Sequence, residues 1–372
     1  MELHDQYGLT PVINARGPFT PLGVSRSTDR VASATAEALS GFFVMEELKD
    51  LADRTIVQVM GGEAGAVVHC TSAAVTLSVA ASMTGTSESR IAALPNTEGM
   101  RRTVLLPAGH AIDYGHPIMQ DIRLTGATPA LVGSDARCSL QELEENLARP
   151  GVACLLLVSS RLTRGEDIPL AEAVAAAHRH DVPAIIDGAA QDFRIEELLG
   201  AGADLVTVSG QKYLRSPTAG LVIGRADLVR AVRAQEKGIG RAMKPSKEAI
   251  FGVVAALRAR QEMNRPVWEQ EQYDKVARFT ERANGLRGIG AAIVPDPTGL
   301  PFPRARLRVD AAGAGMNAAA LARALQSGSP QIWVMAHDQE KGDLTLELIP
   351  LTDPELDVIL SRLSELLRPV PD

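Results

Sequence analysis

Lys212 stands in an unusual place, between two segments that are typical of buried strands. The apolar run 203–210 ends in Ser-Gly, Lys212 follows after one residue, and a second apolar run occupies residues 220–224. Burying a charged ammonium is strongly unfavourable unless its charge is paired or removed. Lys212 is therefore either a surface residue on a turn or a lysine whose charge is removed by a chemical bond.

Other reactive or polar groups also follow apolar runs. Asp187 ends one run, His110 follows another, and the residues 71–74, Thr-Ser-Ala-Ala, open a helical pattern directly after a third. In open α/β sheets, ligands bind beyond the carboxyl ends of the strands, and the first turn of a helix can hold an anion. Each group also has a plainer interpretation: a helix cap for Ser72 or Asp187, and a satisfied polar residue for His110.

Taken as a set, these groups are the parts that a pyridoxal phosphate enzyme needs. A Schiff base between Lys212 and the aldehyde would remove the buried ammonium, and the carboxylate of Asp187 would pair with the protonated ring nitrogen. The helix start would hold the phosphate, and His110 would lie against the ring. One helix and one strand fit between Asp187 and Lys212, so both can lie at neighbouring strand ends. The residues predict pyridoxal 5'-phosphate as the cofactor, with no metal.

The elements that must position these groups alternate along the chain. Continuous apolar runs indicate strands buried on both faces, as in a parallel sheet covered by helices. This alternation predicts an α/β fold with a large, doubly wound, mostly parallel sheet. The expected strands are 64–70, 103–107, 128–133, 152–160, 182–187, 203–210 and 220–224, and the expected helices are 27–38, 45–60, 71–83, 139–148, 169–180 and 194–200.

Three parts are expected along the chain. Residues 1–45 form an N-terminal segment that packs with the small domain or with a neighbouring subunit, and residues 46–240 form the large cofactor-binding domain. Residues 241–372 form a smaller α+β domain. It begins with one long helical stretch, 247–286, and continues with strands at 304–309, 331–336 and 343–350 and helices at 316–326 and 353–367.

Composition narrows the class of protein. The 372 residues are 45% hydrophobic and 22% charged, which is typical of a globular chain, and the net charge of −7 argues against a nucleic-acid-binding surface. Three widely spaced cysteines without a C-x-x-C pair indicate reduced thiols and neither a disulfide framework nor a zinc site. The N-terminus does not read as a secretion signal and no apolar run is long enough to cross a bilayer, so we expect a cytoplasmic protein.

Several motifs resemble a known family. The motifs are VINARGPFTPLG (12–23), GGEAGAVVHCTSAA (61–74), IIDGAAQ (185–191), SGQKYLRSPTAGLVIG (209–224) and GRAMKPSKE (240–248). They resemble fold-type I pyridoxal phosphate enzymes, and more narrowly the group with selenocysteine synthase and D-glucosaminate-6-phosphate ammonia-lyase. The resemblance covers nearly the whole chain. It implies the fold-type I transferase fold and a homodimer or larger oligomer with shared active sites.

The resemblance also assigns roles to residues. It implies that Lys212 binds the cofactor, that Asp187 meets its ring nitrogen, and that His110 covers one ring face, with His116 as a weaker candidate. The other implied cofactor-binding residues are Ser72, Ala73, Ala74 and Ser209 near the phosphate, Ala189 under the ring and Gln191 at the phenolic oxygen. Arg241, Lys244 and Lys247 are either a phosphate-binding cluster or a solvated loop.

The expected substrate is a small polar amino acid. Lys212, freed from the cofactor, would be the base that removes the α-proton, so the catalytic residues are Lys212, Asp187 and His110. Elimination of a β-substituent is the leading hypothesis. A racemase or epimerase is the alternative, transamination is not excluded, and an inactive binding protein on the same fold is the alternative of another class. Substrate carboxylates usually bind arginine, for which the candidates are Arg16, Arg304 and Arg306. Because the chain is acidic and opens almost directly at the VINARG segment, we expect no tRNA, no other nucleic acid and no membrane partner.

Overall fold

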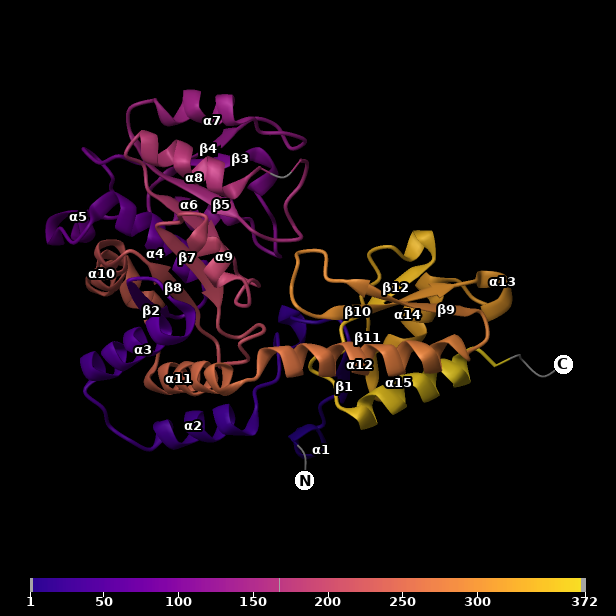
Figure 1. Cartoon of the computed structure of the whole chain (residues 1–372). Helices are drawn as coiled ribbons and strands as arrows, with labels where there is room; N and C mark the ends of the chain where they lie inside the picture. The colour runs from indigo at the N-terminus through magenta and orange to yellow at the C-terminus, as the bar shows by residue number, and fades with distance from the viewer. Residues whose placement is uncertain (1–2, 167, 369–372) are drawn as a thin grey trace. The chain divides into compact units, whose positions relative to one another are not determined.

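A computed structural model describes residues 3–166 and 168–368, and the chain divides into two compact units (Figure 1). Unit 1 combines Met1–Arg26 with Met263–Asp372, and unit 2 is Ser27–Glu262. Each unit has a sheet and a hydrophobic core of its own, so each is described by itself.

Unit 2 is built on a seven-stranded sheet with the strand order β2-β8-β7-β6-β5-β3-β4. Its strands are β2 (Ala64–Val68), β3 (Thr103–Pro107), β4 (Thr128–Val132), β5 (Val152–Val158), β6 (Ala184–Asp187), β7 (Leu205–Ser209) and β8 (Gly220–Gly224). The pairs from β4 to β7 are parallel, whereas β8 runs antiparallel to both β7 and β2. The mostly parallel sheet predicted from the continuous apolar runs is therefore confirmed.

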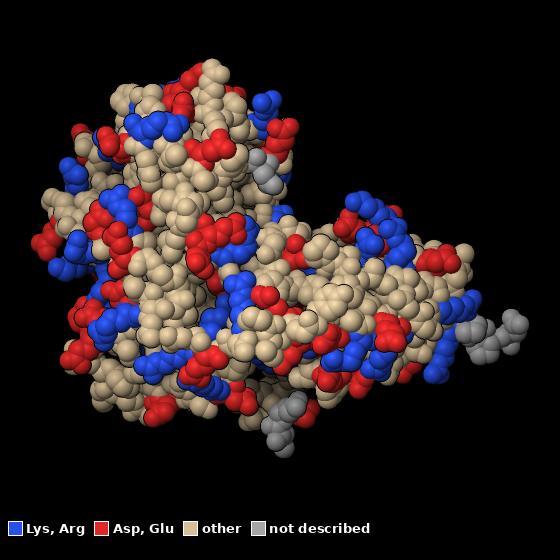
Figure 2. Space-filling view, in the orientation of Figure 1, with Lys and Arg blue, Asp and Glu red and all other residues tan. Residues whose placement is uncertain are grey.

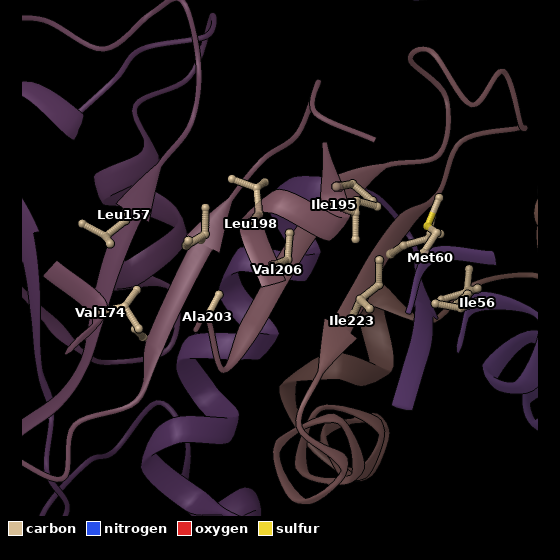
Figure 3. Close-up of a cluster of buried hydrophobic side chains, with 14 of the residues drawn as sticks. Ile56, Met60, Leu157, Val174, Ile195, Leu198, Ala203, Val206 and Ile223 are labelled. Carbon is tan, nitrogen blue, oxygen red and sulfur yellow. The ribbon is translucent and has the colours of Figure 1, made fainter. Parts of the chain in front are cut away.

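Helices cover both faces of this sheet, which explains why its strands do not alternate between apolar and polar residues. The helices of unit 2 are α2 (Asp29–Leu39), α3 (Met45–Met60), α4 (Thr71–Thr84), α5 (Glu88–Ala93), α6 (Ile118–Arg123), α7 (Leu140–Leu147), α8 (Leu170–Arg179), α9 (Ile195–Gly200), α10 (Ala226–Ala234) and α11 (Lys247–Glu262). On one face, side chains such as Leu157, Val206 and Ile223 pack with α3, α8 and α9, as Figure 3 shows. On the other face, Leu156, Ile185 and neighbouring side chains pack with α4, α6 and α10.

Unit 1 is an α+β unit whose main sheet has the antiparallel order β12-β10-β9. A second, two-stranded sheet pairs β1 with β11 in parallel, so the start of the chain folds with its C-terminal part. The strands are β1 (Val12–Asn14), β9 (Ile289–Pro295), β10 (Pro303–Val309), β11 (Gln331–Trp333) and β12 (Asp343–Leu346). The helices are α1 (Leu3–Tyr7), α12 (Arg265–Asn284), α13 (Ala311–Ala314), α14 (Ala318–Gln326) and α15 (Asp353–Leu366).

The unit boundaries differ from the divisions expected at 45/46 and 240/241. Helices α2 and α11, which were assigned outside the large domain, pack against each other and belong to unit 2, where α11 also packs on α3. The reason is the apolar surface of α11: Ile250, Val253 and Leu257 are fully buried in the unit 2 core. The single helical stretch expected at 247–286 is two helices. Asn264 caps the second helix through its side chain, and Pro266 occupies its first turn.

Charges of both signs are interspersed on the face shown in Figure 2. All three cysteines are free, and Cys154 is buried. Within residues 3–166 and 168–368, no helix is both long and apolar enough to cross a membrane.

Candidate active site

Three neighbouring strands of unit 2 bring candidate residues to one edge of the sheet. Strands β5, β6 and β7 are parallel, and Val158 pairs with Asp187, which in turn pairs with Thr207. These three residues therefore form a row across the sheet near its carboxyl edge. Ser209 ends β7 two residues after Thr207, and Lys212 follows in the next turn. This is the edge at which ligands bind in open α/β sheets.

Asp187 is a buried carboxylate, 5% exposed, at the end of β6. Its Oδ1 atom accepts hydrogen bonds from the backbone N–H of Ala189 (3.0 Å) and from the hydroxyl of Thr207 (3.4 Å). Burial raises the pKa of Asp187 to about 6, and the positive charge of Lys212 opposes that rise. A carboxylate in such a place needs a cation, and it favours a cationic ligand over a neutral one.

Lys212 lies in a tight connection between β7 and β8. Its carbonyl accepts from the N–H of Arg215 (3.2 Å), and Arg215 adopts a left-handed backbone with φ of 61°. Lys212 is half-buried, and this burial lowers the pKa of its amine. Asp187 raises that pKa again, whereas Arg161 lowers it further. Lys212 and Asp187 therefore interact electrostatically, and each favours the charged form of the other. The environment of Lys212 differs in this way from that of an exposed lysine on a turn.

The start of α4 supplies the candidate anion site. This 14-residue helix follows β2 after two residues, and Cys70 caps it by accepting from the N–H of Ala73. N–H groups in the first turn of a helix have no partner within the helix and attract anions. Gly220 of β8 runs directly behind this turn: a Cβ atom there would come within 2.3 Å of the Cys70 carbonyl oxygen. Only glycine allows the two backbones to approach this closely.

Asp121 is a second buried carboxylate near the α4 start, which the sequence did not single out. It is 0% exposed, and three side chains from two separate segments, α4 and the loop 113–117, bind it. Ser72 and Tyr114 donate hydroxyl hydrogen bonds to its two oxygens, and His116 Nε2 lies 2.9 Å from Oδ1. Asp121 also raises the pKa of Asp187. The network fixes Ser72 and the loop 113–117 around the first turn of α4.

His110 is held rigidly at the end of β3. It lies in a short 3-10 turn (Ala108–His110), is 7% exposed, and accepts the N–H of Val158 at its Nδ1 atom (2.9 Å). A neutral ring with Nδ1 as acceptor carries its proton on Nε2. His116 is tied instead to Asp121.

The remaining predicted cofactor-binding residues also lie in unit 2. Ala189 accepts the N–H of Ser209 (3.0 Å), which links the ends of β6 and β7. Ala73 and Ala74 are buried in α4, and Gln191 is buried with its Oε1 atom accepting from Arg194 (3.2 Å). In the flanking segment, Lys247 donates to the carbonyls of Leu39 and Gly41, whereas Arg241 and Lys244 are exposed.

The three arginines predicted to bind a substrate carboxylate all belong to unit 1. Arg304 is buried and forms ion pairs with Asp296 (2.6 Å) and Glu347 (3.3 Å). Arg306 is exposed on the same strand, β10. The guanidinium of Arg16 lies 4.0 Å from the centre of the Phe19 ring.

The groups at this edge of unit 2 fit pyridoxal phosphate. The donor set comprises an amine with a lowered pKa, a buried carboxylate that favours a cation, and a helix start that favours an anion. The close approach of Gly220 keeps the helix start clear of side chains from β8. An aldehyde, a protonated ring nitrogen and a phosphate match these three groups in turn.

Sequence reasoning missed four residues near this edge: Asp121, Arg161, Asp192 and Arg260. Asp121 lies inside a short helix, α6, that no apolar periodicity marked. Arg161 lies three residues after the end of β5, so the rule that led to Asp187 could have found it. Asp192 and Arg260 form an ion pair (2.8 Å) across 68 residues of chain, which no local pattern reveals.

Comparison with known proteins identifies relatives along the whole chain. Residues 157–277 match the family SelA, described as L-seryl-tRNA selenium transferase. The chain is 32% identical to D-glucosaminate-6-phosphate ammonia lyase of Salmonella typhimurium over 100% of this chain and 99% of the relative. It is also 32% identical to a Streptomyces 5'-C-glycyluridine monooxygenase-decarboxylase, over 98% of this chain and 92% of the relative.

A solved structure of a D-glucosaminate-6-phosphate ammonia-lyase superposes with a TM-score of 0.89 at 32% identity, covering 99% of this chain and 98% of that structure. The resemblance inferred from the motifs is thus confirmed along the whole chain. The protein belongs to the group of fold-type I pyridoxal phosphate-dependent enzymes that includes D-glucosaminate-6-phosphate ammonia-lyase and selenocysteine synthase.

Proposed function

We propose that this enzyme binds pyridoxal phosphate through Lys212 and eliminates a β-substituent from a small polar amino acid. The observation that carries the proposal is the electrostatic interaction between Asp187, at the end of β6, and Lys212, shortly after the end of β7. Burial lowers the pKa of Lys212, which favours the neutral amine that acts as a nucleophile. Burial also raises the pKa of Asp187, because it removes water from the negative charge, which a bound cation would stabilise.

When bound, the cofactor supplies an aldehyde that takes up an amine and a cationic ring that accepts electrons from the adjacent carbon. The chain supplies the remaining functions. The Asp187 carboxylate holds the ring nitrogen in its charged form, the α4 N–H groups hold the phosphate, and the rigid His110 ring covers one face. Lys212 Nζ accepts the α-proton of the substrate. Ser72, Ala73, Ala74, Ala189, Gln191 and Ser209 complete the proposed cofactor site.

The proposed substrate is an amino acid with a hydroxyl on the β-carbon. Loss of water from such a substrate, followed by hydrolysis of the resulting imine, yields one keto acid and one ammonia, so no external oxidant is needed. The relative from Salmonella is named for D-glucosaminate-6-phosphate, an amino sugar acid of this chemical class. Arg16 and Arg306 are the proposed partners of the substrate carboxylate, because two buried carboxylates already pair with Arg304.

Location and assembly belong to the same proposal. Three free cysteines far apart in sequence support a reducing, cytoplasmic compartment. We also propose a homodimer or larger oligomer with shared active sites, as the resemblance to this group implies. The acidic net charge of −7 supports a small-molecule substrate, with neither nucleic acid nor membrane as a partner.

The test is a screen of β-hydroxy amino acids, including D-glucosaminate and its 6-phosphate, with the cofactor-loaded protein. Equal amounts of keto acid and ammonia are expected with at least one substrate, and no product with Lys212→Ala. Loss of optical rotation without keto acid would instead establish a racemase. Turnover that consumes oxygen would place the enzyme with its Streptomyces relative. A protein that takes up no cofactor would be a binding protein on this fold.

A further inference from the structure

The ion pair between Asp192 and Arg260 lies next to the segment that carries Lys212. The proposed function assigns it no role. Asp192, 6% exposed, follows β6, and Arg260 lies near the end of α11. Arg260 Nη2 donates to Asp192 Oδ2 over 2.8 Å, and the guanidinium lies 3.8 Å from the centre of the Phe193 ring. Both partners are therefore fixed, one by the ring and the other by the ion pair.

The same arginine holds the segment that carries Lys212. Arg260 Nη2 also donates to the carbonyl oxygen of Tyr213, the residue after Lys212, over 3.1 Å. One nitrogen thus joins the Asp192 carboxylate to the Lys212 connection. The electrostatics agree, because Asp192 raises the pKa of Lys212 and Lys212 lowers the pKa of Asp192.

Within the described part of the chain, one carboxylate oxygen of Asp192, the buried Oδ1 atom, accepts no hydrogen bond. Asp204, another buried carboxylate of unit 2, differs in this respect. Its Oδ1 accepts from Arg225 (2.7 Å), and its Oδ2 accepts from the N–H of Ala184 (2.7 Å). A buried acceptor without a donor is unfavourable by roughly 1–3 kcal/mol, so such an atom usually marks a missing partner.

We propose that Asp192 is a positioning residue for Lys212. Its unpartnered oxygen accepts a hydrogen bond from the Lys212 ammonium whenever that side chain is detached from the cofactor. This inference rests on the proposed function, in which Asp187 faces the ring nitrogen and is no longer available to Lys212. Lys212 Nζ takes the α-proton of the substrate and passes it to the departing β-hydroxyl, which leaves as water. Between these two steps Asp192 stabilises the charge on Nζ and fixes its position.

The experiment measures the pKa of Lys212 directly in the full-length protein freed of cofactor. Competitive acetylation across a pH series, read by mass spectrometry of the peptide containing Lys212, gives that pKa without any substrate. Removing a negative charge next to an ammonium lowers its pKa, here by about one unit in Asp192→Asn. Below the pKa, acetylation of Lys212 should then be up to about tenfold faster than in the wild type.

Two comparisons separate this effect from loss of stability. Asp204→Asn removes an equally buried, arginine-paired carboxylate and should leave the Lys212 pKa unchanged. Asp192→Glu and Asp192→Gln match each other in size and differ in charge, so only the glutamine variant should show the low pKa. This pair carries the test if Asp192→Asn does not fold.

In the cofactor-loaded enzyme, Asp192→Gln should lower kcat about tenfold or more and leave KM within about twofold. A Lys212 pKa that is identical in the glutamate and glutamine variants would overturn the inference. Because acetylation needs no cofactor, that result is distinguishable from failure of the proposed function, which would appear as a wild-type protein that attaches no pyridoxal phosphate.

Discussion

At the scale of single residues, the site depends on two groups that burial drives in opposite directions. An ammonium and a carboxylate in water would both be charged at neutral pH. Here burial lowers the pKa of Lys212 and raises the pKa of Asp187, so it disfavours the charged form of both groups. The charge of each group partly reverses the pKa shift of the other. A ligand that takes the Lys212 amine into a covalent bond and offers a cation to Asp187 satisfies both groups.

The pH dependence of cofactor attachment follows from the lowered pKa of Lys212. Only the neutral amine attacks an aldehyde, so the attachment rate should fall about tenfold per pH unit below that pKa and level off above it. The levelling should occur below about pH 10.4, the ordinary lysine pKa, because burial favours the neutral amine. Stopped-flow absorbance across a pH series measures this, with Nα-acetyllysine as the reference. A profile that coincides with the reference would contradict the assignment.

At the scale of elements, the close approach of β8 to the start of α4 shapes the candidate anion site. In Gly220→Ala the new methyl group would meet the backbone of Cys70 and Thr71, which cannot move aside as a side chain can. The variant should unfold more easily by about 1–3 kcal/mol and bind pyridoxal phosphate at least about tenfold more weakly. Denaturant unfolding and cofactor titration measure the two effects. Gly200→Ala is the control, since nothing lies within 4 Å of its added atom; equal effects in both variants would refute the close-approach argument.

The sequence predicted the elements well where a single local signal dominates. Continuous apolar runs located β3 and β8 exactly, and the helix Met45–Met60 ends at Gly61, whose φ of 85° only glycine adopts readily. The short helices α5 and α6 were missed, because they bury too few residues to show a period. The seven-residue strand β9 was missed because it is mostly half-buried and has no continuous apolar run. The break between α11 and α12 was missed because apolar residues continue on both sides of Asn264.

The candidate site was predictable to the extent that it lies on strand ends. Asp187 and Lys212 stand next to apolar runs, so local sequence marked them. The Ser72–Asp121 hydrogen bond spans 49 residues and the Asp192–Arg260 pair spans 68, so both depend on packing that no window of sequence contains. The prediction for Arg304 rested on its residue type, and the structure shows the two carboxylates that share its charge.

At the scale of the whole molecule, the two units perform different tasks. Unit 2 carries the amine, the carboxylates and the helix start, whereas unit 1 is stabilised around its own charge cluster of Arg304, Asp296 and Glu347. Removing one partner of a buried ion pair leaves uncompensated charge and is typically destabilising by about 3–5 kcal/mol.

Arg304→Met should therefore lower the melting temperature and leave the attachment of pyridoxal phosphate to Lys212 intact at low temperature. Calorimetry and cofactor absorbance measure the two properties on the same sample. A higher KM for substrate without any loss of stability would instead make Arg304 the carboxylate-binding arginine. Arg306→Met, at the exposed position two residues further along β10, is the matched control for stability.

The central claim is that Lys212 forms the covalent bond to pyridoxal phosphate. Its most direct test is borohydride reduction of the protein loaded with pyridoxal phosphate, followed by mass spectrometry of its peptides. The account predicts one added reduced cofactor per chain, located on the peptide that contains Lys212, and no such addition in Lys212→Ala. Cofactor fixed at another lysine, or fixed equally in the wild type and in Lys212→Ala, would contradict it.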